Sequence, residues 1–291
     1  MPSSCCKRPC GRETSGPTNP GARCSCGRPN WGASVGGVHM KKALPSEFKA
    51  AAEAIARGIT GEALDLVRGS TLTPKPIEWL WREWLAAGKF HVFGGAPGTG
   101  KTTIAMALAA TLTSGGNWPD GTRARPSSVT IWSGEDDLAD TLAPRLKSAG
   151  ADLDRVHFVS TVHDEYGRRP FDPAKDIDLL AAKLRNVSGV RLLIVDPLVS
   201  VVAADSHKNA ETRRSLQPLA DLAASLGVAV LGITHFSKGT AGREPVERLT
   251  GSLAFGALAR VVWVAAKNQK DGAERIFLRA KSNIGPDGGG S

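Results

Sequence analysis

Residues Gly95–Thr102 read Gly-Ala-Pro-Gly-Thr-Gly-Lys-Thr, with glycine at the first and sixth positions and a Lys-Thr pair at the end. Glycine lets the backbone curl so that successive N–H groups point inward, and a helix that starts there adds partial positive charge. Such a turn binds a triphosphate, because the lysine reaches the β- and γ-phosphates and the last hydroxyl ligates Mg²⁺. The sequence therefore predicts a site for ATP and Mg²⁺. The predicted nucleotide-binding residues are Gly95, Ala96, Pro97, Gly98, Thr99, Gly100, Lys101, Thr102 and Thr103.

The segments on either side of this motif distinguish it from a glycine-rich turn that contains lysine by chance. An apolar run of strand length, 90–93, precedes it, and a helix-like stretch, 102–113, follows it. A phosphate-binding P-loop requires this order of strand, turn and helix. Lys101 is accordingly predicted to act in catalysis, and Thr102 to bind the metal ion.

A second metal-binding residue is predicted at Asp196, which closes the apolar run 192–195. An acid at the end of a buried strand holds the Mg²⁺ shell in P-loop proteins, through water or through the P-loop hydroxyl. An apolar strand ending in aspartate is common, so the prediction depends on the P-loop that precedes it.

Glu135 is predicted to be the catalytic acid, because it lies where the apolar run 129–132 ends. At the carboxyl edge of a parallel sheet its side chain would face the γ-phosphate and orient the attacking water. The alternative is that Glu135, Asp136 and Asp137 are favourable acids in the first turn of the next helix. We adopt that alternative for the two aspartates.

His235 follows the apolar run 228–233, again at the end of a predicted strand. A lone histidine is usually structural, but a hydrogen-bonding group at the tip of such a strand can sense the γ-phosphate. We predict this role for His235. His91 and His157 lie within strands and are predicted to be packing residues.

The elements that must position these residues alternate along the chain. Strands that alternate with helices predict a mostly parallel twisted sheet with helices on both faces, the α/β architecture of a RecA-like P-loop NTPase. The predicted strands are 90–93, 129–132, 156–159, 192–195, 228–233, 261–265 and, after a turn at Asp271-Gly272, 275–281. The predicted helices are 46–68 (one or two), a short one over 79–85, 102–113, 136–148, 176–186 and 210–226.

Composition separates the first part of the chain from the rest. Residues 1–39 contain all five cysteines and are rich in Gly, Pro, Ser and Arg, which predicts a disordered or non-native extension. The cysteine spacing fits no common zinc motif. Residues 40–74 are predicted to form a helical segment and linker, and 75–291 an ATPase domain. No run approaches the roughly 18 apolar residues of a membrane span, so a cytoplasmic protein is expected.

Taken in order, these motifs resemble the RecA-like hexameric replicative helicases, most closely those of the plasmid RepA type and the AAA-family ATPases of phages and mobile elements. The resemblance covers about residues 75–285. It depends on Trp79-Leu80-Trp81, Ala87-Gly88-Lys89, the P-loop, Ser133-Gly134-Glu135-Asp136, Ile194-Val195-Asp196-Pro197, Thr234-His235 and Gly251-Ser252 followed by Arg260.

The resemblance implies a homo-oligomer, a hexameric ring in the family's manner, in which Arg260 completes the ATP site of the neighbouring subunit. It also implies that Glu135 activates water, that Asp196 serves the metal, and that His235 couples nucleotide state to loops that bind single-stranded DNA. The stretch 236–249, which contains Lys238, Arg243 and Arg248, and the stretch 200–209 are the expected DNA loops.

Each of these implications has an alternative. Arg260 is otherwise a residue that caps a helix or flanks the strand 261–265, and Arg279 and Lys281 are secondary candidates for its role. The two loops are otherwise solvated segments with scattered charge.

Three functions compete at this point. The leading hypothesis is an ATP-hydrolysing motor, a replicative helicase or translocase on single-stranded DNA. The second is an ATP-dependent switch or loader that does not unwind DNA. The third is a small-molecule kinase, in which His235 and the segment 251–260 would have no role.

Overall fold

A computed structural model describes residues 66–202, 209–249, 253–268 and 274–286. Contacts divide the chain into two units, Met1–Leu72 and Thr73–Ser291. The described part of the first unit is 66–72, which contains one 3₁₀ turn, η1 (Gly69–Thr71). The helices predicted over 46–68 lie outside the described residues except for the last three positions, which are not helical.

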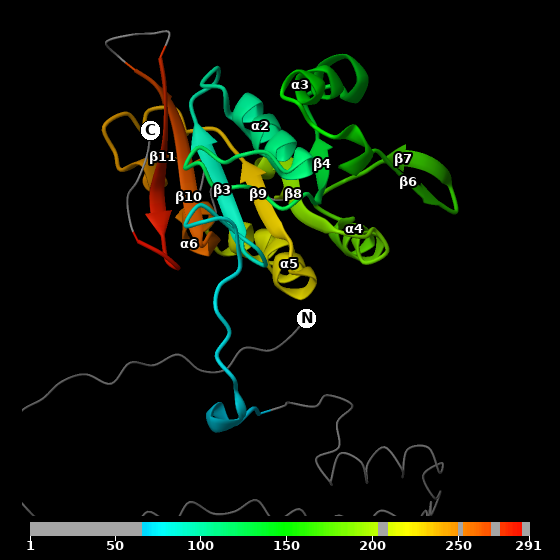
Figure 1. Cartoon of the computed structure of the whole chain (residues 1–291), viewed down its shortest axis with the longest axis horizontal. Helices are drawn as coiled ribbons and strands as arrows, with labels where there is room; N and C mark the ends of the chain where they lie inside the picture. Colours follow the sequence, from blue (N-terminus) through cyan, green and yellow to red (C-terminus); the bar gives the residue numbers. More distant parts are fainter. Residues whose placement is uncertain (1–65, 203–208, 250–252, 269–273, 287–291) are drawn as a thin grey trace, which may run out of the picture. The chain divides into compact units, whose positions relative to one another are not determined.

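The second unit is built on a seven-stranded sheet with the order β11-β10-β3-β9-β8-β4-β5 (Figure 1). Adjacent strands are parallel except at one edge, where β10 and β11 are antiparallel. Each strand predicted from an apolar run is confirmed. The strands are β3 (Phe90–Gly95), β4 (Ser128–Ser133), β5 (Val156–Phe158), β8 (Val190–Asp196), β9 (Ala229–Ile233), β10 (Val261–Lys267) and β11 (Arg275–Ser282).

The central strands are apolar at almost every position because both faces of the sheet are covered. In β8, Leu193 and Val195 belong to the hydrophobic cluster on one face. Leu192 and Ile194 belong to the cluster on the other face. Since successive side chains of a strand point to opposite sides, a run without polar residues is what two covered faces require.

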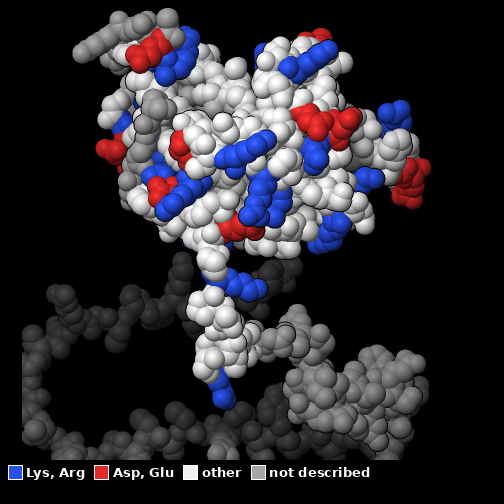
Figure 2. Space-filling model, in the orientation of Figure 1, with Lys and Arg blue, Asp and Glu red and all other residues white. Residues whose placement is uncertain are grey.

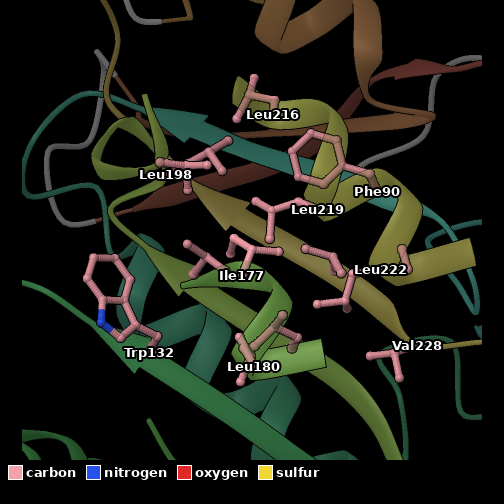
Figure 3. Close-up of a cluster of buried hydrophobic side chains, with 14 of the residues drawn as sticks. Phe90, Trp132, Ile177, Leu180, Leu198, Leu216, Leu219, Leu222 and Val228 are labelled. Carbon is pink, nitrogen blue, oxygen red and sulfur yellow. The ribbon is translucent and has the colours of Figure 1, made fainter. Parts of the chain in front are cut away.

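The helices divide between these two faces. Side chains of α2 and α3 pack in one cluster. Those of α4, α5 and α6 pack in the other, where Leu216, Leu219 and Leu222 form one face of α5 (Figure 3). The helices are α2 (Lys101–Ser114), α3 (Ala143–Ser148), α4 (Ile177–Leu184), α5 (Asn209–Leu226) and α6 (Leu253–Leu258), with 3₁₀ turns η3 (Leu153–Arg155), η4 (Leu198–Val201) and η5 (Pro245–Arg248).

The short helix predicted over 79–85 is wrong. These residues form an antiparallel hairpin of β1 (Trp79–Trp81) and β2 (Leu85–Ala86). Glu83 has a φ of 64°, which ends any helical path. The rings of Trp81 and Trp84 stack with centroids 4.6 Å apart, so the apolar spacing reflects aromatic packing. Aromatic residues also favour strands over helices.

A second hairpin was not predicted at all. It consists of β6 (Thr161–Asp164) and β7 (Gly167–Pro170), and it pairs with no other strand of the described chain. The helix predicted over 136–148 begins with a π-helical turn, η2 (Leu138–Leu142), before α3. The predicted Asp271-Gly272 turn lies outside the described residues.

Within the described residues, no helix has both the length and the apolar character needed to span a membrane.

Candidate nucleotide site

The P-loop lies between the end of β3 at Gly95 and the start of α2 at Lys101. Gly98 and Gly100 have φ angles of 70° and 88°, which favour glycine. A Cβ on Gly95 would lie 2.5 Å from the carbonyl oxygen of Ala265 in β10, so glycine is required there by close packing. The predicted strand, turn and helix are all present.

Lys101 is the buried cation of this loop, with 5% of its surface exposed. Its Nζ donates hydrogen bonds to the carbonyl oxygens of Gly95 (3.1 Å) and Ala96 (3.0 Å), and lies 3.2 Å from His235 Nδ1. Burial lowers the pKa of Lys101, and Asp196 and Glu135 partly oppose this. No carboxylate of the described residues lies within 4.0 Å of Nζ. A buried ammonium without a salt-bridge partner is costly, which fits a site for an anion.

Thr102 and Asp196 are brought together from α2 and β8. The Thr102 hydroxyl donates to Asp196 Oδ2 at 2.9 Å. Burial raises the pKa of Asp196, the Thr102 hydrogen bond lowers it, and Glu135 and Asp136 raise it further. A hydroxyl and a carboxylate in contact are oxygen ligands that Mg²⁺ accepts alongside water and phosphate. Among the described residues, no cluster of three or more His, Cys, Asp or Glu forms a separate metal site.

Glu135 lies just beyond β4, whose last residue, Ser133, is in register with Asp196. The Glu135 side chain is exposed, and its charge acts on both Lys101 and Asp196. Its aspartate neighbours have different partners. Asp136 pairs with Arg145 Nη1 at 3.0 Å.

Asp137 caps the following helical turn, as predicted. Its Oδ1 accepts hydrogen bonds from the backbone N–H groups of Ala139 (2.7 Å) and Asp140 (3.0 Å). Because these bonds stabilise the charged carboxylate, they lower the pKa of Asp137.

Arg260 is not brought to these residues. It lies at the start of β10, where its backbone N–H donates to Phe90 O at the first residue of β3. That is the amino edge of the parallel sheet, opposite the edge that carries the P-loop, and the side chain is exposed.

The two secondary candidates for the role of Arg260 make contacts within the chain. Arg279 donates to Glu83 O at 2.8 Å and lies over the ring of Trp84. Lys281 donates to the carbonyl oxygens of Gly256 (2.7 Å) and Ala259 (3.1 Å), near the end of α6. Both side chains are therefore engaged within their own chain.

His91 is a packing residue, as predicted. It is fully buried, and its Nε2 accepts a hydrogen bond from the backbone N–H of Ala86 at 3.1 Å. Burial lowers the pKa of His91 to about 4, so the ring is neutral at physiological pH.

The loop that follows His235 is folded back on itself. Phe236 and Leu249 form an antiparallel bridge, and the Arg248 guanidinium lies 4.3 Å from the centre of the Phe236 ring. Lys238 and Arg243 are exposed. Of the other expected DNA loop, residues 203–208 lie outside the described chain, as do Gly251 and Ser252.

Two residues near the site were not predicted. A Cβ on Gly94 would overlap Leu249 Cδ2 and lie 3.3 Å from Phe236 Cε1, so the loop packs directly on the strand that leads into the P-loop. Lys267, at the end of β10, has its Nζ 3.9 Å from the position that a Cβ of Gly98 would take. The only sequence signal for Gly94 was the adjacent glycine pair. Lys267 had none.

Comparisons with known proteins agree with this site. The sequence profile described as AAA domain matches residues 60–241, so the chain belongs to the AAA domain family. The chain therefore carries an ATPase domain, and the predicted RecA-like α/β P-loop fold is confirmed.

Solved structures are similar at low sequence identity. The ATPase domain of a helicase is 15% identical, with a TM-score of 0.48 over 69% of this chain and 79% of that one. The RadB recombinase is 19% identical, with a TM-score of 0.48 over 69% of this chain and 84% of that one. No curated protein matches the sequence.

Proposed function

We propose that this protein is an ATP-hydrolysing motor that moves on single-stranded DNA as a ring, in the manner of a replicative helicase of the plasmid RepA type. The observation that supports this best is the contact between Lys101 Nζ and His235 Nδ1. It joins the phosphate cradle to the residue that opens a loop with exposed basic side chains. A switch or loader without movement on DNA is the alternative.

In the proposed site, Lys101 neutralises the phosphate charge and the backbone of the P-loop binds the triphosphate. Thr102 and Asp196 would hold Mg²⁺, which neutralises charge on the phosphates when bound. Glu135 orients a water molecule for attack and accepts its proton. Its place beside the Asp196 strand puts it at the same edge of the sheet as Lys101.

Coupling to DNA follows from the same contacts. Lys101 cannot bind both a phosphate and His235 in their present positions, so nucleotide binding frees the His235 ring from this contact. His235 adjoins Phe236, which packs with Arg248 and lies close to Gly94. A change at His235 therefore reaches the loop that contains Lys238 and Arg243, the proposed DNA contacts.

The charge pattern of the surface is consistent with local contacts of this kind. On one face of the described structure, Lys and Arg side chains are interspersed with Asp and Glu (Figure 2). Binding would then depend on a few loop residues, because phosphate contacts, one per lysine or arginine, determine the affinity for single strands.

Arg260 is proposed to act on the neighbouring subunit, since it lies at the opposite edge from its own P-loop. An arginine supplied in trans stabilises the charge of the transition state and accelerates hydrolysis by about a thousandfold or more. Hydrolysis would then require assembly of the ring.

The experiment is the ATPase rate of the full chain with and without single-stranded DNA, with oligomer size measured by light scattering. We expect an oligomer whose hydrolysis is stimulated by DNA and abolished in Glu135→Gln. Mixtures of Arg260→Ala and Lys101→Ala subunits should regain activity, because one subunit supplies the arginine and the other the intact P-loop. A monomer indifferent to DNA would refute the motor and favour the switch.

A further inference from the structure

We propose that Lys267 is a second cation of the nucleotide site and attracts the phosphate chain of bound ATP from the side of the P-loop occupied by Gly98. The proposal rests on the nucleotide site described above. It adds a nucleotide-binding residue that neither the P-loop motif nor the resemblance assigned.

The register of the sheet places Lys267 at the site. β10 lies beside β3, and Ala265 is paired with Gly95, the first residue of the P-loop. Lys267 is two positions further along β10, so its side chain points to the same face of the sheet as that of Ala265. Ala265 packs in the cluster that α2 covers, and α2 is the helix that begins at the P-loop. The side chain therefore extends toward the phosphate cradle.

The position of the ammonium group agrees with this register. Lys267 Nζ lies 3.9 Å from the point that a Cβ of Gly98 would occupy. Gly98 is exposed and has no side chain, so nothing on that residue separates the ammonium from the loop backbone. A larger residue at position 98 would also be strained, because its φ is 70°.

Lys267 has no carboxylate within 4.0 Å of its ammonium among the described residues. Lys267 is exposed, whereas Lys101 is buried, so the two cations lie at the rim and in the interior of the loop. Two cations with no salt-bridge partner in the described chain thus approach one short loop, one from a helix and one from a strand. A triphosphate carries enough negative charge to engage both.

The expected effect is a loss of affinity that depends on charge. At a distance of a few ångströms and in a partly exposed setting, one unit charge changes the affinity for Mg-ATP about fivefold. Because the ammonium is exposed, salt should reduce the effect, since the screening length falls from about 10 Å at 0.1 M to about 3 Å at 1 M. ATP should lose more than ADP, as it has one more phosphate.

The test measures nucleotide dissociation constants of the full chain by displacement of a fluorescent nucleotide, at about 0.05 M and about 1 M salt. The variants are Lys267→Gln, Lys267→Arg and the control Lys147→Gln, an exposed lysine of α3. We expect about fivefold weaker Mg-ATP binding for Lys267→Gln at low salt only, near wild-type binding for Lys267→Arg, and no change in the control.

Two results would overturn the proposal while leaving the nucleotide site intact. One is unchanged binding in Lys267→Gln when Lys101→Ala has lost its affinity. The other is an equal loss in Lys267→Gln and Lys267→Arg, which would indicate a role of shape. If the wild-type chain binds no nucleotide, the proposed function and this inference both fail.

Discussion

Replacing His235 with alanine should strengthen the binding of ADP. In the structure, Lys101 Nζ lies 3.2 Å from His235 Nδ1, and the ammonium must leave this contact to reach a phosphate. A hydrogen bond of this kind contributes about 1 kcal/mol net, because water replaces it on one side of a half-buried ring. The contacts of Lys101 to the Gly95 and Ala96 carbonyls are the same in both proteins. Removing the imidazole should therefore tighten ADP binding about fivefold.

ADP is the ligand of choice because it has no γ-phosphate for His235 to contact, so only the competition for Lys101 is measured. The assay is isothermal calorimetry with Mg-ADP, and the matched control is His163→Ala, an exposed histidine of β6. The same His235→Ala protein should hydrolyse ATP without stimulation by single-stranded DNA. ADP binding that is unchanged or weaker would refute the competition between His235 and the phosphate.

Three further substitutions test the packing around the site. Gly94→Val should push Leu249 away from β3, lower the unfolding free energy by about 1–3 kcal/mol in urea titration and reduce DNA stimulation. Leu198→Ala, at a fully buried position, should cost about 2–5 kcal/mol in the same titration and leave nucleotide affinity unchanged. Asp196→Asn should abolish Mg²⁺-dependent binding yet raise the Tm at pH 7. Since burial raises the pKa of Asp196, its charged form destabilises the fold above that pKa, and the gain in Tm should vanish as the pH falls below the ordinary carboxyl range.

The parts of the fold that could be predicted from the sequence are those set by local pattern. The run 192–195 had to be a buried strand because no polar residue interrupts it, and the strand ends at Asp196 as expected. Parallel strands share a carboxyl edge, so Lys101, Glu135 and His235 could be placed together before any coordinates. The structure places them near one another, and their roles are proposals.

The errors have equally physical causes. The spacing of Trp79 and Trp84 fits one helical face, but it also fits a hairpin whose rings stack, and only the tertiary aromatic cluster decides between them. Lys267 could not be predicted because sheet order is not sequence order. β10 is far from β3 along the chain yet lies directly beside it, and no local pattern states that neighbour.

Sheet order also explains why His235 can link two events. β9 lies between β3, which leads into the P-loop, and β8, which ends in Asp196. A residue at the tip of β9 is therefore adjacent to both the phosphate cradle and the predicted metal ligand. Had β3 and β8 been neighbours, nothing between them could have responded to the nucleotide.

The same arrangement carries the effect in the other direction. The loop that leaves His235 returns to pack against Gly94 in β3, so a displacement of the β9 tip changes the packing on the strand that supports the P-loop. DNA bound to the loop should consequently alter nucleotide affinity by the same factor by which nucleotide alters DNA affinity. Titrating Mg-ADP into the chain with and without single-stranded DNA measures one factor, and titrating DNA with and without Mg-ADP measures the other. Two factors that differ beyond error would contradict a single coupled equilibrium through His235.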